Sequence, residues 1–286
     1  MSGLARACFL AAVLLGAACA KGAEDESLDQ GEGGVGPLAD AQPDVATADA
    51  GEVDAARDAV ADAPGDACTV ALAAITFDFE AGAQGWTHGN SDGVGPPTVW
   101  PFDPWLQGAA TKGTACKSGK CFGTDLTQNY AQCHRGFVVS PPVDLSACKG
   151  RAVSLVFQHA YGFWTGAYGG QTWFDGGVVE LSGDGTTWQV PTGPYPGTVK
   201  INPDRGLSYA CVSKNAFSVH NKQGFVGQQA ATVRAELVVP PSAITATTRI
   251  RFSTAAGVSS DSSTADSSRP FTDFGWRIDD VGFLAK

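Results

Sequence analysis

Two pairs of acidic residues stand near opposite ends of the globular part of the sequence. Asp78 and Glu80 belong to an alternating run that predicts a first strand, and Asp279 and Asp280 belong to the run that predicts the last strand. Carboxylates gathered at the rim of a fold repel one another unless a cation neutralises them, and Ca²⁺ takes roughly six to eight oxygen ligands. Neighbouring residues of a regular strand point to opposite faces, so only one of Asp279 and Asp280 can reach a shared ion unless the strand bulges. The alternative interpretation is a set of solvated charges at strand ends.

Aromatic side chains crowd into the 14 residues from Tyr161 to Phe174, with glycines between them. Rings on a glycine-rich loop present flat apolar faces that suit sugar rings, and we take four of them as candidate ligand-binding residues. These are Tyr161, Trp164, Tyr168 and Trp173. The alternative interpretation is that the rings pack against one end of the core.

Motifs of catalysis are missing from the sequence. It has neither the H-E-x-x-H pattern of zinc proteases nor the G-x-S-x-G pattern of serine hydrolases. Its four histidines are scattered without ligand spacing, and His159, inside an expected strand, is better interpreted as a core or cross-strand residue. Glycoside hydrolysis needs two carboxylates at a set separation, which a sequence does not reveal. We therefore expect no enzyme, and a polysaccharide-active hydrolase or lyase is the alternative.

The negative charge is confined to one segment. Residues 20–67 hold 13 acids, 2 bases and no aromatic residue, whereas residues 68–286 hold 16 acids and 16 bases. High net charge with few large apolar groups predicts an acidic disordered linker. The neutral globular part has no basic excess to hold phosphates, which argues against nucleic acid as a partner.

The N-terminus predicts export. Residues 1–19 combine Arg6 with an apolar run that is long enough for a signal peptide and too short to span a bilayer. The run ends in Leu15-Gly-Ala-Ala-Cys19, which resembles a bacterial lipobox and makes Cys19 the expected lipidation site. The alternative is cleavage after Ala20. The first outcome is an outer-membrane or cell-surface lipoprotein that meets the membrane only through its lipid, and the second is a secreted protein.

Residues 68–286 are expected to form one domain of short strands. Turns rich in Gly and Pro separate runs that alternate or are β-branched, and no helical period lasts beyond a turn or two. This pattern predicts an all-β sandwich or barrel. A turn is expected at Ser182–Gly185. The strand-like runs are 75–79, 152–157, 177–181, 186–190, 235–239, 248–252, 276–278 and 281–283.

Six cysteines in this domain predict three disulfides formed in an oxidising compartment. Cys116 and Cys121 flank the short turn Lys-Ser-Gly-Lys and are expected to pair. The other four are assigned as Cys133–Cys148 and Cys68–Cys211, although six cysteines allow many connectivities.

Several short motifs follow one another in a fixed order. They are Phe77-Asp-Phe-Glu80, Gly85-Trp86, Gly123-Thr-Asp-Leu126, Val139-Ser-Pro-Pro-Val-Asp-Leu-Ser146, Asp175-Gly-Gly-Val-Val-Glu-Leu-Ser182 and Gly275-Trp-Arg-Ile-Asp-Asp-Val281. This order resembles the jelly-roll accessory domains that follow the catalytic domain in immune inhibitor A-type metalloproteases, and it is similar to MAM domains. The resemblance covers residues 75–284. The sequence departs from it by having no protease domain and a longer Cys-rich insertion at 108–135.

The resemblance implies a two-sheet antiparallel jelly-roll sandwich without catalytic residues, often with one structural Ca²⁺ where the first and last strands meet. It implies Glu80 and Asp280 as side-chain ligands, with Asp78 and Asp125 as further candidates. The expected function is a non-catalytic binding or adhesion module at the cell surface, with a glycan or a cell-surface protein as ligand. A structural subunit of the cell envelope is a further alternative.

Overall fold

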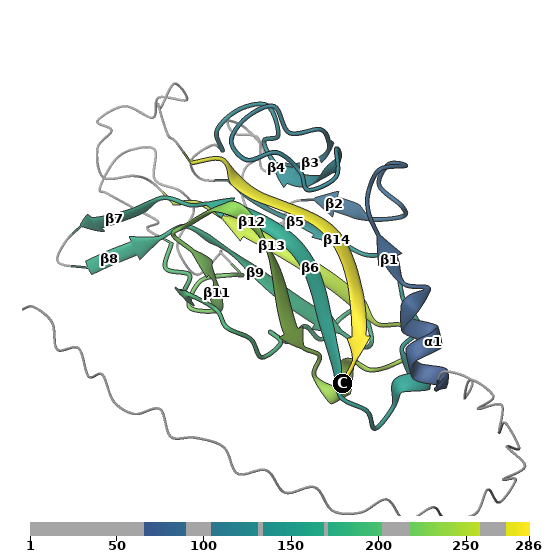
Figure 1. Ribbon diagram of the computed structural model, residues 1–286. Coiled ribbons are helices and arrows are strands. Elements are labelled where there is room, and N and C mark those ends of the chain that lie inside the picture. The colour runs from purple at the N-terminus through teal and green to yellow at the C-terminus, as the bar shows by residue number, and fades with distance from the viewer. Residues whose placement is uncertain (1–65, 90–103, 131–133, 169–170, 202–217, 258–272) are drawn as a thin grey trace, which may run out of the picture. The chain divides into compact units, whose positions relative to one another are not determined.

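The structure, a computed structural model, describes residues 66–89, 104–130, 134–168, 171–201, 218–257 and 273–286 (Figure 1). All of these residues belong to one unit of the chain, residues 59–286. The expected signal peptide, its lipidation site and the linker up to residue 65 lie outside the described residues. Within the described part, no helix is long and apolar enough to cross a membrane.

The first of two six-stranded antiparallel sheets carries both the start and the end of the domain. Its strand order is β12-β6-β14-β4-β3, and β1 pairs with the C-terminal half of β14. Here β14 is the central strand, because it pairs with β6, β4 and β1. The strands are β1 (Thr76–Phe77), β3 (Trp105–Gly108), β4 (Cys121–Thr124), β6 (Val153–Gly162), β12 (Gln228–Val238) and β14 (Gly275–Ala285).

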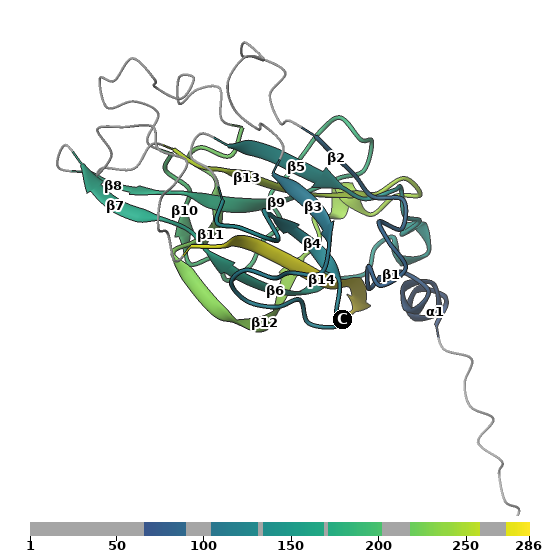
Figure 2. The ribbon, with the colours of Figure 1, turned by 90° about the horizontal axis from the view of Figure 1, so that it is seen from above.

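The second six-stranded sheet lies against the first (Figure 2) and has the order β10-β11-β9-β13-β5-β2. A two-stranded hairpin, β7 (Thr165–Tyr168) with β8 (Gln171–Phe174), extends beyond both sheets (Figures 1 and 2). The expected all-β sandwich of two antiparallel sheets is confirmed. The strands of the second sheet are β2 (Thr87–Gly89), β5 (Arg135–Val139), β9 (Gly176–Ser182), β10 (Gly197–Thr198), β11 (Gln223–Val226) and β13 (Arg249–Ala255).

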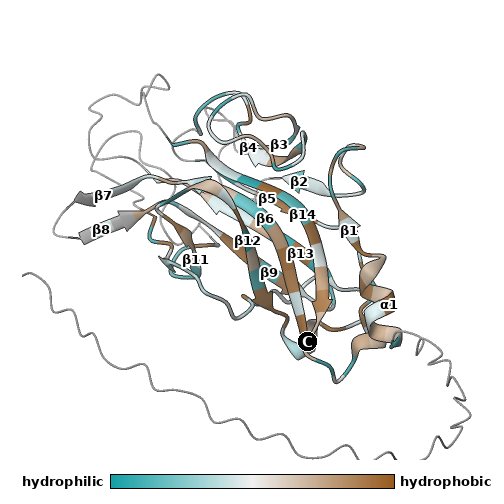
Figure 3. Ribbon diagram, in the orientation of Figure 1, coloured by the Kyte–Doolittle hydropathy of each residue, from teal (hydrophilic) through white to brown (hydrophobic). Residues whose placement is uncertain are grey.

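Aromatic rings from both sheets form the centre of the core. Side chains alternate along a strand, so every second residue of β6, β13 and β14 points inward. Phe157 of β6 packs edge-on against Phe252 of β13 at 5.1 Å between ring centroids, and Phe252 packs against Trp276 of β14 at 5.5 Å. Hydrophobic stretches are visible on these strands and on neighbouring elements such as β12 and α1 (Figure 3). Burying such rings is the main source of stability for the sandwich.

A short helix, α1 (Ala67–Ala73), precedes the first strand. Asp66 caps it by accepting hydrogen bonds from the amides of Cys68 and Thr69. Cys68 and Leu72, one helical turn apart, are its buried residues. Ala67 is the first residue of this helix and Asp66 is its N-cap.

Strands form at or within nearly all of the expected runs, with one exception at 186–190. There, the carboxylate of Asp184 accepts hydrogen bonds of 2.7 Å from the amides of both Thr186 and Thr187. This holds the backbone in a turn, and only Gln189 pairs with Leu181 of β9. The expected strand is wrong because the turn at Ser182–Gly185 runs on through Thr187. Two 3₁₀ turns, η1 (Ser146–Cys148) and η3 (Pro241–Ala243), complete the described elements.

Candidate functional site

A bulge in β14 sets the position of its two neighbouring acids. Asp279 pairs with Gln158 of β6 and Gly282 pairs with Val156, so β14 has one residue more than β6 over this stretch. Asp280 lies inside the bulge with φ of 46°, in the left-handed region. The regular alternation of the strand is broken here, and both acids contact the same loop, as described next.

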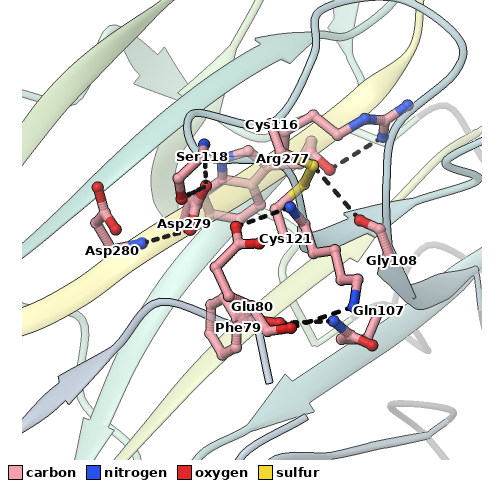
Figure 4. The surroundings of a disulfide bond; sticks show 12 residues. Phe79, Glu80, Gln107, Gly108, Cys116, Ser118, Cys121, Arg277, Asp279 and Asp280 are labelled. Carbon is pink, nitrogen blue, oxygen red and sulfur yellow. Dashed lines mark hydrogen bonds between the residues drawn. A yellow bond between two sulfur atoms is a disulfide. The ribbon is translucent and has the colours of Figure 1, made fainter. Parts of the chain in front are cut away.

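That loop runs between Cys116 and Cys121, which form a disulfide as expected (Figure 4). The amide and the hydroxyl of Ser118 donate to Oδ2 of Asp279 at 3.1 and 3.2 Å. The Nζ of Lys117 lies 3.0 Å from Oδ2 of Asp280. The loop is therefore attached to the bulge of β14 by hydrogen bonds and by one ion pair.

Glu80 reaches the same loop from the other end of the domain. Phe79, which precedes it, has φ of 56° and is fully buried, so the chain turns sharply after β1. Oε1 of Glu80 accepts from the amide of Lys120 at 2.9 Å, and the carbonyl of Glu80 accepts from Nζ of Lys120 at 3.1 Å. Glu80 and Asp280, the two side-chain ligands expected for calcium, thus both contact residues of one short loop.

Asp78 has a different role in the structure. Its Oδ1 accepts hydrogen bonds from the amide of Glu80 and from Nε2 of Gln84. The same Gln84 side chain accepts from the amide of Phe79. Asp78 therefore closes the turn that follows β1.

Asp125 lies just beyond β4, where Arg277 of β14 holds the chain. Arg277 is buried, and its guanidinium donates to the carbonyls of Thr124, Asp125 and Lys112. Burial lowers the pKa of Arg277 to about 10, and the charge of Asp125 opposes this shift. The guanidinium of Arg277 therefore joins the main chain at Lys112 to the end of β4.

The four expected calcium ligands do not form a compact set of oxygens. Among the described residues, no three His, Cys, Asp or Glu side chains are arranged to hold a metal ion. The carboxylates nearest the expected site accept hydrogen bonds or face an ammonium group, and burial raises the pKa of Asp279. N–H groups aimed at carboxylate oxygens occupy the positions that a cation needs. The site as it stands does not fit a calcium ion, and calcium stays a prediction.

The expected aromatic ligand-binding residues are divided between core and hairpin. Tyr161 is buried at the end of β6, where its ring packs against Phe163 and Phe225, so this residue belongs to the core. Trp164 is half-buried at the base of the hairpin. Tyr168 is the last residue of β7 and Trp173 lies on β8. Two of the four candidates therefore belong to the strands of the hairpin.

A buried hydrogen-bond network at the base of this hairpin was not foreseen as a site. The hydroxyl of Tyr130 donates to Oδ2 of Asp175 at 2.9 Å and accepts from the amide of Trp164 at 2.6 Å. The other oxygen of Asp175 accepts from the amide of Gly257 at 2.8 Å. Burial and the charge of Asp175 raise the pKa of Tyr130 well above its ordinary value, so the phenol stays protonated. Asn129-Tyr130 and Asp175-Gly176 are ordinary in sequence, and nothing in their spacing signals this contact.

His159 is a core residue, as expected. It is 3% exposed, and its Nδ1 accepts a hydrogen bond from Nε1 of Trp276 at 3.2 Å. Burial lowers its pKa to about 4, so the ring is neutral near pH 7.

The second described disulfide corrects the expected pairing. Cys68 of α1 is bonded to Cys148 of η1, with 4.7 Å between their Cα atoms. The pairings Cys68–Cys211 and Cys133–Cys148 are therefore wrong. The two cysteines lie close together because α1 packs beside η1. This contact joins segments 80 residues apart, and no local sequence pattern predicts it. Cys133 and Cys211 lie outside the described residues.

Comparison with known proteins finds similarity among solved structures only. No family model and no curated protein matches the sequence. Among solved structures, the chain is similar to the K2 cleaved adhesin domain of Lys-gingipain, with 15% identity, a TM-score of 0.38 and coverage of 73% of this chain and 98% of that chain. It is also similar to the CBM22-2 xylan-binding domain of Paenibacillus barcinonensis Xyn10C, with 12% identity, a TM-score of 0.34 and coverage of 74% and 99%. At these values the similarities carry no argument about fold or function.

Proposed function

We propose that the chain is an exported, surface-anchored, non-catalytic binding module that contacts a glycan through the β7–β8 hairpin. The observation that carries this proposal is the position of the hairpin, which extends beyond both six-stranded sheets (Figure 1). In its register Gly166 pairs with Trp173 and Tyr168 pairs with Gln171. Each strand of this projecting ribbon thus carries an aromatic residue in its sequence, Tyr168 on β7 and Trp173 on β8. Aromatic rings suit stacking on sugar rings.

The base of the hairpin supports such a role because it is fixed. Trp164 precedes β7 and Asp175 follows β8, and Tyr130 binds both of them from the end of β4. The amide of Asp175 also donates to the carbonyl of Trp164 at 3.1 Å. A contact surface that is ordered before binding loses less conformational freedom when the ligand arrives. The network therefore favours a binding role for the ribbon that it holds.

The proposal is tested by affinity electrophoresis of the purified full chain in gels that contain neutral or acidic soluble polysaccharides. We expect retention by at least one polysaccharide, and a loss of affinity of roughly tenfold or more in Trp173→Ala and Tyr168→Ala. Trp188→Ala is the matched control, since Trp188 lies at the far end of β9 against Arg251. Equal retention of all three variants would show that the hairpin is not the contact surface. Release of reducing ends or unsaturated products from the same polysaccharides would favour the hydrolase or lyase instead.

A second function, a structural subunit of the envelope, is favoured by one feature of the first sheet. β12 is an edge strand of 11 residues, and in the described part of the chain only Thr192 pairs with its outer side, at Val238. Open edges of this length can pair with another chain. Sedimentation of the full chain over a wide concentration range tests this function. Assembly that a Thr232→Pro substitution on β12 abolishes would favour the structural subunit, whereas a monomer throughout would remove it.

A further inference from the structure

Three carboxylates meet at one rim of the sandwich although they come from opposite ends of the domain. Glu80 follows β1, and Asp279 and Asp280 occupy the bulge of β14, the strand to which β1 is paired. Three like charges in this position destabilise the junction of the two strands unless opposite charges lie close by. The source of those charges determines whether the fold depends on a metal ion.

Each residue between Cys116 and Cys121 contacts one of these carboxylates. Lys117 pairs with Asp280, Ser118 donates twice to Asp279, and Lys120 donates to Glu80 through its amide. The remaining residue is Gly119, with φ of 107°, and a Cβ atom there would lie 3.0 Å from Oε2 of Glu80. Glycine is thus required both for the backbone conformation and for the close approach of the carboxylate.

The charges nearly balance at this rim. The ammonium group of Lys117 pairs with the carboxylate of Asp280, and that of Lys120 donates to the main-chain carbonyl of Glu80. The amides of Ser118 and Lys120 add partial positive charge directed at the carboxylate oxygens of Asp279 and Glu80. Asp279 is buried, whereas Lys117 and Asp280 are partly exposed. A divalent cation would have to displace these donors to gather enough oxygens around itself.

The disulfide makes this arrangement easier to form. Holding two long lysine side chains in one place costs rotamer and backbone entropy. Because Cys116 and Cys121 are bonded, the loop between them is already restricted before it meets the carboxylates. Cys121 is also the first residue of β4, which pairs with both β3 and β14. The loop is therefore attached to the same sheet that carries Asp279 and Asp280.

We propose that the Cys116–Cys121 loop acts as a built-in cation, in which Lys117 and Lys120 take the place of a metal ion at the junction of β1 and β14. The junction then folds without calcium. This inference is independent of the ligand of the module and does not rest on the proposed function.

The test is thermal unfolding of the full chain, with disulfides intact, in excess Ca²⁺ and in EDTA. We expect the same Tm in both solutions for the wild type. For Lys117→Met/Lys120→Met we expect a Tm lower by several degrees in EDTA and partly restored by Ca²⁺, because the three carboxylates are then left without fixed positive charges. Lys149→Met, which removes an exposed lysine at the end of η1, is the matched control and should behave like the wild type.

Two results would overturn the proposal. One is a wild-type Tm that rises by several degrees with Ca²⁺ and loses this response in Asp280→Asn, since the carboxylates would then bind the metal themselves. The other is a double lysine variant whose Tm equals that of Lys149→Met. If the double variant does not fold, a double-mutant cycle of Lys117→Met with Asp280→Asn measures the same interaction between two partly exposed side chains. Additive shifts of Tm in that cycle would also contradict the proposal.

Discussion

The hydroxyl of Tyr130 donates a hydrogen bond of 2.9 Å to the carboxylate of Asp175, and the two residues are 45 positions apart in the chain. Tyr130 follows β4 of the first sheet, whereas Asp175 joins the hairpin to β9 of the second sheet. Both side chains are buried, so water does not compete for the contact. One phenol thus connects the segment between β4 and β5 to both ends of the hairpin.

Replacing Tyr130 by Phe removes this connection without changing the shape of the ring. The amide of Trp164 loses its acceptor and the carboxylate of Asp175 loses one donor. We expect a loss of about 1–3 kcal/mol in the free energy of unfolding, which is usual when a buried polar group loses its partner. Urea denaturation of the full chain measures it. Tyr161→Phe is the control, because the ring of Tyr161 packs in the core against Phe163 and Phe225, and equal stability of the two variants would contradict the prediction.

The buried imidazole of His159 predicts a loss of stability in mild acid. Its pKa is about 4 in the folded protein, against an ordinary value of 6.5. Between these two pH values the unfolded chain holds a proton that the folded protein does not, so the free energy of unfolding falls as the pH falls. The full effect is at most roughly 3 kcal/mol. We expect Tm to decrease between pH 7 and pH 5, and His159→Gln to show a flatter profile.

Other groups do not obscure this comparison, because they are present in both proteins. Hydrogen bonds from the turn lower the pKa of Asp184, so its contribution is lost only at more acidic pH than that of His159. Burial raises the pKa of Asp273 and Asp279, and these groups oppose the decrease as the pH falls. The difference between wild type and variant isolates the histidine. Parallel profiles would mean that the imidazole does not titrate as the structure requires.

The sequence reveals the strands because their signal is local. In β13, for example, Ile250 and Phe252 point into the core while Arg249 and Arg251 between and beside them do not, and this alternation is visible without any knowledge of the partner strands. The same reasoning fails at 186–190, where hydrogen bonds to one side chain decide the backbone. The disulfide between Cys68 and Cys148 could not be predicted for a different reason, since it depends on how segments 80 residues apart pack.

The candidate site was only partly visible in the sequence. Glu80 and Asp280 were expected together and do bind one loop, but Asp279 was not expected to join them, because a bulge leaves no signature in an alternating strand. The positive charges were missed for the same kind of reason. Lys117 and Lys120 flank Ser118-Gly119 inside a disulfide loop. They lie near the acids only because of how the insertion folds against β14, which the sequence does not reveal.

The disulfide between Cys68 and Cys148 predicts a large effect on stability. It fixes α1 beside η1 and closes a loop of 80 residues, which restricts the unfolded chain strongly. We expect Cys68→Ala/Cys148→Ala to lower the free energy of unfolding by about 2–4 kcal/mol. Urea denaturation under non-reducing conditions measures the change. A comparable loss in Cys116→Ala/Cys121→Ala, whose loop spans only five residues, would contradict the role given to loop length.

Gly177 of β9 faces the ring of Trp276 across the core, and this contact predicts that the position does not accept a side chain. A Cβ atom there would lie 2.3 Å from two ring carbons of an indole that is fully buried. That ring cannot move aside freely, because its Nε1 donates a hydrogen bond to His159 and the ring packs edge-to-face with Phe252. Gly177→Ala should therefore destabilise the sandwich by about 1–3 kcal/mol, as overpacking does in close-packed cores. Gly89→Ala is the control, since its Cβ would meet only the half-buried ring of Phe137 at 3.3 Å. Thermal unfolding followed by near-ultraviolet circular dichroism measures both, and equal Tm values for the two variants would mean that the sheets can separate enough to admit a methyl group.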